Sequence, residues 1–382
     1  MKIDLLYPVL PPSIDGIGDY TALLAAELAK GHTVRILTSE GNNFTPIPNV
    51  EIVPTFSLSN HSTFHRLFDS VERAQTDWLV LQYNPFGFGR RGYNLTLPRV
   101  MERISRESRQ TKVAMMSHES YVPLESFKWF IMRLWQRPQF RKLLHVASIS
   151  FFSVEFRIAM HRSWEPDRPL IHLPVGANIP QVEISREEAR QRLGIRPDDV
   201  VIGVFGQAHM SRSFEPIRRA IDALRKKGLA VTLLYIGPDG EQVKTQLTNV
   251  KMIVDGPHPP DEVSKRLAAI DVFVATYSDG LTTRRGAFIA GMQHGLPLVG
   301  TISSHTGDLL AAENGKSFLL SPPQETDQMV ANVLRLVDDR SFGHAMGRNA
   351  RTLYDRAFAW PVIAKTMLAE FDAFDQSHRS KR

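Results

Sequence analysis

The sequence contains no cysteine, which excludes disulfides, thiol nucleophiles and thiolate metal sites. It also lacks any apolar run of the roughly 18 residues that span a bilayer. Asp4 and several prolines interrupt the first 13 residues, where a signal peptide would be continuously apolar. No repeat of solenoid period and no low-complexity tract is present. These absences predict a soluble protein that stays in the cytoplasm.

Composition and charge narrow the class further. The chain has 382 residues, of which 43% are apolar and 23% charged, as in globular proteins, and this length favours two domains. The formal net charge is +6, and four arginines recur at near-helical spacing: Arg99, Arg103, Arg106 and Arg109. Such a stripe is either a solvated helix face or a surface attracted to phosphates or a membrane. Because no nucleic-acid-binding signature accompanies the charge, no nucleic-acid partner is expected.

Apolar runs alternate with helical patterns in both halves of the chain, which is typical of doubly wound parallel sheets. Strands are predicted at 3–7, 34–37, 78–81 and 113–116, and then at 200–205, 231–236, 250–254, 272–275 and 298–301. Between them, residues 174–185 are rich in turn formers, and Ser185 with Glu188 forms a capping box that opens a new helix. We therefore expect an α/β fold with domains at 1–178 and 179–357. Residues 358–382 should form a final helix that packs on the first domain, followed by a basic tail from 377 to 382.

Two segments of the first domain follow predicted strands, at the sheet edge where open α/β sheets bind ligands. Gly16 and Gly18 precede the first helix, where free N–H groups and the helix dipole favour an anion, although the same glycines also suit a plain tight turn. His118 and Glu119 follow the strand at 113–116. His118 is a candidate for a hydrogen bond to a sugar hydroxyl or for orienting a leaving phosphate, and Glu119 for meeting an acceptor. A purely structural histidine is the alternative.

Two more segments follow strands of the second domain. Residues 206–212 contain Gln207 and Arg212, and the guanidinium of Arg212 suits a diphosphate because it is always charged and binds phosphate bidentately. A surface arginine is the alternative. Residues 279–286 read Asp-Gly-Leu-Thr-Thr-Arg-Arg-Gly and run into a helix, so they combine a carboxylate for hydroxyl groups with a phosphate cradle. The predicted cradle comprises Gly280, Leu281, Thr282, Thr283, Arg284 and Arg285. Asp279 and Thr282 as helix caps are the alternative, which leaves the paired arginines unexplained because they oppose the helix dipole.

With these segments in place, the chain resembles the GT-B glycosyltransferases, specifically the large retaining group called family 4, along nearly its whole length. The matching features are the Gly16–Gly18 loop, His118, a linker at 174–180, the segment 256–271 before an Asp-Val-Phe-Val strand, the Gly-Leu-Pro-Leu-Val run at 295–299, and Trp360. The resemblance implies a GT-B fold with two Rossmann-like domains that face a central cleft.

The sequence departs from this family at two places. The family's basic pair that holds the donor diphosphate corresponds to Gln207 and Arg212, so one charge is missing. Its two glutamates, counted back from Gly295, correspond to Thr282 and Ala290, so both are absent. We interpret the chain as a variant in which Asp279 takes over the contact with the donor sugar and an arginine replaces the lost charge.

The resemblance implies a retaining transfer from a nucleotide-diphosphate sugar to a hydroxyl of a glycan, lipid-linked or small-molecule acceptor. His118, Asp279 and Arg212 are the expected catalytic residues, and Asp19 and Glu119 the acceptor-side residues. No cofactor besides the nucleotide-sugar co-substrate and no metal is expected, since the sequence has no Asp-x-Asp motif. Two rivals remain: a degenerate nucleotide-sugar-binding protein, and an NAD-dependent dehydrogenase. The dehydrogenase is disfavoured because the glycine fingerprint is incomplete. It is also disfavoured because no acidic residue that could bind the ribose follows the second strand before Glu40.

Residues 127–144 suggest a further partner. Aromatic and aliphatic residues alternate there with Lys128, Arg133, Arg137 and other cations, interrupted at Pro138. Because the apolar residues occupy more than one helical face, burial in the first domain is one interpretation. The other is an interfacial helix in peripheral contact with a membrane that carries a lipid-linked acceptor.

Overall fold

The structure is a computed structural model that describes residues 1–208 and 210–379. Its contacts divide the chain into two compact units. Unit 1 comprises Met1–Pro174 together with the chain from Trp360 onward, and unit 2 comprises Val175–Ala359. The division falls slightly earlier than the expected 178/179 boundary, because the backbone N–H of Val175 already donates to Thr283 O of unit 2, at 3.1 Å.

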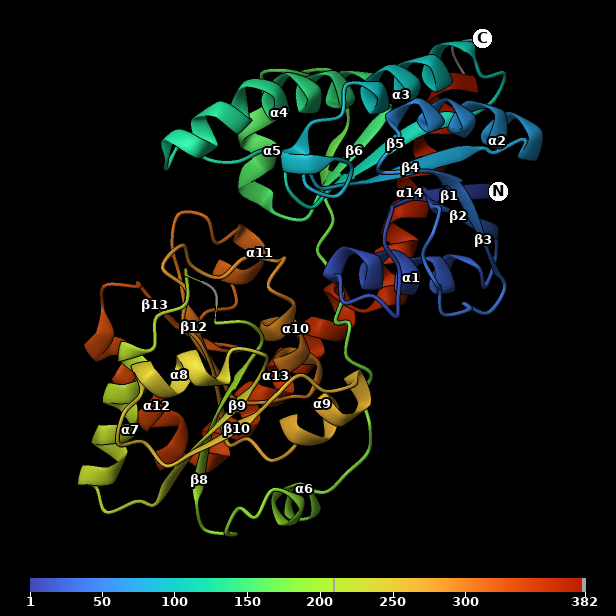
Figure 1. The fold of residues 1–382 in the computed structure, drawn as a ribbon. Helices are drawn as coiled ribbons and strands as arrows, with labels where there is room; N and C mark the ends of the chain where they lie inside the picture. The colour runs from blue at the N-terminus through green and yellow to red at the C-terminus, as the bar shows by residue number, and fades with distance from the viewer. Residues whose placement is uncertain (209, 380–382) are drawn as a thin grey trace. The chain divides into compact units, whose positions relative to one another are not determined.

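Unit 1 is built on a parallel sheet with the strand order β3-β2-β1-β4-β5-β6-β7 (Figure 1). Its strands are β1 (Lys2–Leu6), β2 (Thr33–Ser39), β3 (Val50–Phe56), β4 (Trp78–Tyr83), β5 (Lys112–Ser117), β6 (Ile149–Phe152) and β7 (Leu170–His172). Its helices are α1 (Gly16–Leu28), α2 (Arg66–Ala74), α3 (Thr96–Glu107), α4 (Phe127–Val146), α5 (Glu155–Arg162) and α14 (Trp360–Arg379), with short 3-10 turns η1 (His61–His65) and η2 (Arg90–Gly92).

Helices cover both faces of this sheet, which is why its strands are continuous apolar runs. Side chains of α2, α3 and α4 form one core with the sheet. Helices α1 and α14 contact each other on the opposite side (Figure 1). The ring of Trp78 in β4 stacks on Phe371 of α14, with centroids 4.2 Å apart. This contact ties the last helix to unit 1 although it follows unit 2 in sequence.

Unit 2 has a second parallel sheet, in the order β10-β9-β8-β11-β12-β13. Its strands are β8 (Val200–Phe205), β9 (Val231–Ile236), β10 (Met252–Asp255), β11 (Val272–Ala275), β12 (Leu298–Thr301) and β13 (Leu319–Ser321). Its helices are α6 (Arg186–Arg192), α7 (Glu215–Lys226), α8 (Gly240–Gln246), α9 (Pro260–Leu267), α10 (Gly286–Gln293), α11 (Asp308–Ala311), α12 (Thr326–Asp338) and α13 (Arg340–Ala357). Ser185 caps α6 as predicted, since its Oγ accepts from the backbone N–H of Glu188 at 3.1 Å, whereas the Glu188 carboxylate accepts from Arg192 Nη2 at 2.6 Å.

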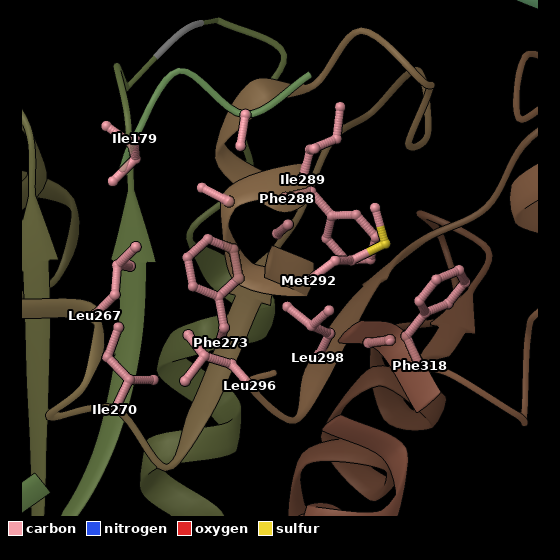
Figure 2. Close-up of a cluster of buried hydrophobic side chains, with 14 of the residues drawn as sticks. Ile179, Leu267, Ile270, Phe273, Phe288, Ile289, Met292, Leu296, Leu298 and Phe318 are labelled. Carbon is pink, nitrogen blue, oxygen red and sulfur yellow. The ribbon is translucent and has the colours of Figure 1, made fainter. Parts of the chain in front are cut away.

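Each face of the second sheet also has its own core. Figure 2 shows the cluster in which Phe288 and Met292 of α10 lie with Phe273 of β11 and Leu298 of β12. Gly291 allows this close packing, because a Cβ there would lie 2.7 Å from Leu298 Cδ2. The packing fixes the start of α10, which directly follows the predicted phosphate cradle at 280–285.

The expected α/β doubly wound architecture is confirmed, and the strands that the sequence missed are short or lie toward a sheet edge. Strand β3 contains Pro54, which is tolerated because β3 pairs only with β2. Strands β7 and β13 have three residues each, which is too short to show a pattern, and β6 has four and lies next to the edge strand β7.

The predicted tail from 377 to 382 is partly helical. Helix α14 continues to Arg379, and the ring of His378 stacks on Phe374 with centroids 3.9 Å apart. Residues 380–382, the rest of that predicted tail, lie outside the described residues. None of the helices in the described part of the chain combines the length and the hydropathy needed to cross a membrane.

Candidate functional site

The strand order of each sheet reverses once, and loops after the two central strands flank that point. In unit 2 the reversal lies between β8 and β11, and in unit 1 between β1 and β4. Ligands of open α/β sheets bind outside the carboxyl ends of the strands at such a point. The predicted segments 206–212 and 279–286 follow β8 and β11, so the fold brings them to the expected place in unit 2.

Arg212 is held against the loop after β11. The chain turns at Gly206, whose φ of 97° lies in the left-handed region, and Arg212 then forms an isolated antiparallel bridge with Tyr277. Arg212 Nη2 donates to Phe205 O at 2.9 Å and to Tyr277 Oη at 2.7 Å. The residue is only 6% exposed, and its Nε and Nη1 have no hydrogen-bond partner among the described residues. Arg212 is therefore a buried cation whose hydrogen-bonding capacity is only partly used, not a surface arginine.

Tyr277 packs against two guanidinium groups. Arg212 Cζ lies 4.9 Å and Arg285 Cζ 4.1 Å from the centre of its ring, within the range of cation–π attraction. Thr301 fixes the tyrosine backbone, because its Oγ1 accepts from Tyr277 N at 2.9 Å and donates to Tyr277 O at 2.8 Å. The ring of Tyr277 thereby keeps the positively charged Arg212 and Arg285 side chains close to each other.

Asp279 binds the second of these arginines. Arg285 Nη2 donates to both carboxylate oxygens at 2.7 Å, while Arg285 Nε has no partner in the described part of the chain. Arg284, the next cation of the motif, is partly buried. Burial, and then the charge of Arg285, lowers the pKa of Arg284 to about 10, so it stays protonated at neutral pH. The loop therefore carries more positive than negative charge.

The other members of the motif differ in what they offer. Gly280 is required by its φ of 77° and because a Cβ would lie 2.5 Å from Ser303 Oγ. Leu281 is fully buried in the core and its N–H donates to Thr301 O at 2.8 Å, so its role is packing. Thr282 is also buried, with an Oγ1 that has no partner within residues 1–208 and 210–379. Thr283 anchors the linker through its bond from Val175 N.

Apart from Arg212, the loop after β8 offers mostly neutral groups. Gln207 is exposed and neutral, and His209 lies outside the described residues. The N–H of Ala208 donates to Asp239 Oδ2 at 2.8 Å. Beside Arg212 the surface is hollowed to about 440 Å³, a volume within the range of small-molecule sites. The hollow is lined by Met210, Ser211, Arg212, Ser213, Phe214, Glu215, Gln246 and Ser278.

In unit 1, His118 is a buried neutral side chain. Its Nε2 hydrogen-bonds Gln82 Oε1 at 2.8 Å, and its ring lies edge-on to Tyr20 with centroids 4.8 Å apart. Burial, and then the positive charge of Arg157, lowers the pKa of His118 to about 3. His118 therefore offers hydrogen bonds at neutral pH and no positive charge to a phosphate.

Arg157 of α5 links the two predicted residues after β5. Its Nη1 donates to His118 O at 2.9 Å and its Nη2 to Glu119 Oε2 at 2.8 Å. Three buried polar atoms near this corner have no partner among the described residues, namely Tyr20 Oη, Gln82 Nε2 and Ser117 Oγ. The corner is thus polar, rigid and charge-compensated.

Two N–H groups of the Gly16–Gly18 loop are already bound by the helix-capping residue Asp15. Asp15 Oδ1 accepts from Ile17 N at 2.9 Å and from Gly18 N at 2.7 Å. A Cβ at Gly18 would lie 2.6 Å from Val9 O, so close packing accounts for this glycine. These contacts favour the tight turn over an anion cradle at the start of α1. Asp19 lies half-buried in the first turn of that helix.

Several residues of these sites carry no signal by themselves in the sequence. Tyr277 stands just before the predicted motif, but only the fold pairs it with Arg212. Gln82 and Arg157 come from β4 and α5, and nothing in their local sequence connects them with His118. In the described part of the chain, no group of three or more His, Asp or Glu is placed to hold a metal ion.

Comparison with solved structures shows the class of fold. The chain is similar to sucrose-phosphate synthase from Thermosynechococcus elongatus, with 16% identity, 99% of this chain and 100% of that chain covered, and a TM-score of 0.72. It is also similar to HepE from Anabaena in complex with UDP and glucose, at 14% identity, with 98% and 100% covered and a TM-score of 0.69. WaaG, a glycosyltransferase involved in lipopolysaccharide biosynthesis, matches at 15% identity, with 96% and 98% covered and a TM-score of 0.65. The chain has the GT-B fold.

A protein-family model matches most of unit 2. Residues 199–339 match the family model described as "Glycosyl transferases group 1". None of the curated proteins matches the sequence. The matched segment lies wholly within unit 2 and contains Arg212, Tyr277 and Asp279–Arg285. The resemblance of this chain to the GT-B glycosyltransferases of group 1 is thus confirmed.

Proposed function

We propose that the protein transfers a sugar from a nucleotide-diphosphate donor to a hydroxyl group of an acceptor. The observation that carries this proposal is the cluster of Arg212, Arg284 and Arg285 after β8 and β11 of unit 2. Arg212 and Arg285 pack on one tyrosine and hold buried donor atoms without partners among the described residues. Buried guanidinium nitrogens without partners are costly unless an anion accepts their hydrogen bonds.

The diphosphate of a sugar nucleotide has the chemistry that this cluster requires. When the bond between sugar and phosphate breaks, negative charge grows on the departing diphosphate. Fixed guanidinium groups stabilise that charge without reorganisation, and the low dielectric of a buried site strengthens their effect. In this proposal the arginines supply the positive charge that is missing at Gln207, and no metal ion is needed.

Asp279 and Thr282 are the proposed contacts to the donor sugar. Asp279 is about one-third exposed while it holds Arg285, so its oxygens remain accessible to sugar hydroxyls. The complexes of HepE contain UDP and glucose, which supports UDP as the first nucleotide to test. The resemblance to family 4 supports retention of configuration, with departure and attack on the same face of the sugar.

The acceptor side is assigned to unit 1. His118 would contribute hydrogen bonds as a neutral imidazole, and Asp19 and Glu119 carboxylates for hydroxyl groups. Glu119 already shares Arg157, so it would act as an oriented acceptor of hydrogen bonds. The proposed acceptor is a carbohydrate or a lipid-linked sugar, and the proposed place of action is the cytoplasm, in line with the absence of cysteine.

One observation favours the alternative of a nucleotide-sugar-binding protein without turnover. Ala290, which stands where the family has its second glutamate, is fully buried in the core. No carboxylate therefore reaches the ribose from this position. A dehydrogenase finds no such support, because Asp15 already occupies the amides at the start of α1.

A thermal-shift screen against UDP, GDP, ADP, TDP, CMP and NAD tests the proposal without knowledge of the acceptor. A ligand at a hundred times its dissociation constant adds about 2.7 kcal/mol to the free energy of unfolding. Stabilisation by one nucleoside diphosphate, followed by release of that diphosphate from its sugar conjugate, supports a transferase. Binding without release supports the binding protein, and a shift with NAD alone contradicts the proposal.

A further inference from the structure

Helix α4 has two apolar faces, and only one of them is buried. Met132, Phe140 and Leu143 lie in the core of unit 1. A second set remains open to solvent: Phe127 is 78% exposed, Phe130 49%, Ile131 38% and Leu134 62%. Their spacing of three, four and seven residues places them on one side of the helix. We call these four residues the α4 stripe.

Neighbouring residues extend this exposed apolar surface. Leu124, just before the helix, is 62% exposed. Tyr93, which is 48% exposed, follows η2, and its ring lies 6.2 Å from Trp135 of α4. Large side chains exposed one by one are ordinary, but a contiguous group of them marks an interaction surface. Tyr93 comes from a second segment, which the fold places beside α4 through the contact between the Tyr93 and Trp135 rings. The exposed apolar surface therefore does not depend on one helical turn.

Positive charge surrounds the α4 stripe. Segments 84–96 and 121–142 together contain seven arginine and lysine side chains and one carboxylate, Glu125. Lys128, Arg90 and Arg91 are exposed and form no ion pair within the described part of the chain. The loop of Arg91 is fixed to the helix, because Arg91 O accepts from Trp135 Nε1 at 3.1 Å and from Gln136 Nε2 at 3.0 Å. The cations are thus held beside the stripe.

We propose that the α4 stripe docks unit 1 on an anionic lipid surface. The aromatic and aliphatic tips would enter the boundary between headgroups and acyl chains, and the cations would meet the lipid phosphates. Charge complementarity selects this occupant over a second copy of the chain, since two such faces would bring like charges together. The proposal is independent of glycosyl transfer, because it uses none of the residues assigned to donor or acceptor.

Vesicle flotation with the full chain tests this surface. The protein is mixed with vesicles of phosphatidylcholine alone or with about one-third phosphatidylglycerol, at low and at high salt. We expect flotation with the anionic vesicles, which high salt weakens because screening shortens the reach of surface charge. Phosphatidylcholine vesicles should carry much less protein. Absence of binding to anionic vesicles at low salt would overturn the proposal.

Two variants and two matched controls locate the contact. The variant Phe130→Ser with Leu134→Ser should weaken binding by about tenfold or more, because it removes apolar area that enters the bilayer. Lys128→Glu should weaken it by at least about fivefold, the equivalent of about 1 kcal/mol per surface charge. Ile14→Ser, at the 97% exposed Ile14, and Lys316→Glu, at an exposed lysine of unit 2, should bind as the original chain does.

The positions are exposed, so all four variants should melt within about two degrees of the original chain. Equal binding by the stripe variants and their controls would overturn the proposal. So would light scattering that shows a dimer which the Phe130→Ser and Leu134→Ser variant abolishes, because the stripe would then be an interface between copies.

Discussion

Arg285 binds both carboxylate oxygens of Asp279 through a single nitrogen, Nη2, and leaves its Nε without a partner among the described residues. An arginine that meets a carboxylate in its preferred way uses two nitrogens in a parallel fork. The one-nitrogen contact leaves Nε free to donate to a further acceptor. Asp279 is therefore a counter-ion that neutralises Arg285 without saturating it, and an arriving diphosphate would compete with it.

This competition predicts the effect of Asp279→Asn. The substitution removes a negative charge beside three arginines, so the dissociation constant of a nucleoside diphosphate should fall by about fivefold, the upper range for a partly exposed ion pair. Transfer should nevertheless slow, because Asp279 is also the proposed contact to the donor sugar. Calorimetric titration with UDP measures the first effect and steady-state kinetics the second.

Asp327→Asn is the matched control, since Asp327 pairs with Arg219 on another surface of unit 2. It changes the net charge equally and should leave both quantities unchanged. If Asp279→Asn weakens binding of the free nucleoside diphosphate, Asp279 does not compete for Arg285.

Removal of an arginine should weaken nucleotide binding, the opposite of the effect expected for Asp279→Asn. Arg284→Ala and Arg285→Ala should each lower kcat/KM or donor affinity by about 10- to 150-fold, which corresponds to a charged hydrogen bond of about 1.5–3 kcal/mol. The free energy of unfolding should change by about 2 kcal/mol or less, since even Arg285→Ala removes only one cation–π contact of about 0.5–2 kcal/mol and a partly exposed ion pair. Arg219→Ala serves as a control for loss of an arginine elsewhere. Full transfer rates in both variants would show that the phosphate assignment is wrong.

Central strands can be predicted from the local sequence alone, whereas edge strands cannot. The central strands, such as β8 and β11, are runs of apolar and β-branched residues, and their positions were predicted within a residue or two. Edge strands gave no such signal, as Pro54 in β3 illustrates. The loops of the candidate site could be proposed from the sequence because they follow predicted strands.

The pairing of side chains could not be predicted in the same way. Arg212 and Tyr277 are 65 positions apart, and the contact depends on the order of β8 and β11 in the sheet. Likewise, α4 is apolar on two faces, and only its packing on the sheet decides which face is buried. Sequence patterns identify elements, whereas partners across the fold depend on topology and packing.

Tyr277 should matter for stability through its ring and through its hydroxyl. Tyr277→Phe removes one acceptor from the buried Arg212 and should cost about 1 kcal/mol of unfolding free energy. Tyr277→Leu also removes two cation–π contacts, each of about 0.5–2 kcal/mol, and should cost about 2–4 kcal/mol. Urea denaturation measures both. Equal costs for the two variants would contradict the role of the ring.

Thr232→Val is a control for the loss of a buried hydroxyl in unit 2, because Thr232 Oγ1 donates to Asp199 Oδ2 at 2.9 Å, outside the candidate site. It should reduce stability without a change in nucleotide affinity. Tyr277→Phe should reduce both, since it alters the position of Arg212.

The last prediction concerns pH and His118. Burial and the charge of Arg157 lower the pKa of His118 to about 3, whereas a histidine in the unfolded chain has a pKa of about 6.5. Between these values the unfolded state binds a proton that the folded state does not. Stability therefore falls as the pH falls below about 6.5, by about 1.4 kcal/mol per pH unit for one such group.

His118→Gln removes this proton-linked loss. The pKa of His161 is also lowered, to about 4, first by burial, so the original chain should lose stability through at least two histidines. Between pH 6.5 and pH 5, the unfolding free energy of His118→Gln should therefore fall by about 2 kcal/mol less than that of the original chain. His65→Gln, at an exposed histidine, should follow the original curve. Parallel curves for His118→Gln and the original chain would mean that His118 accepts a proton in the folded state, which would restore a charged imidazole as a candidate partner of the phosphate.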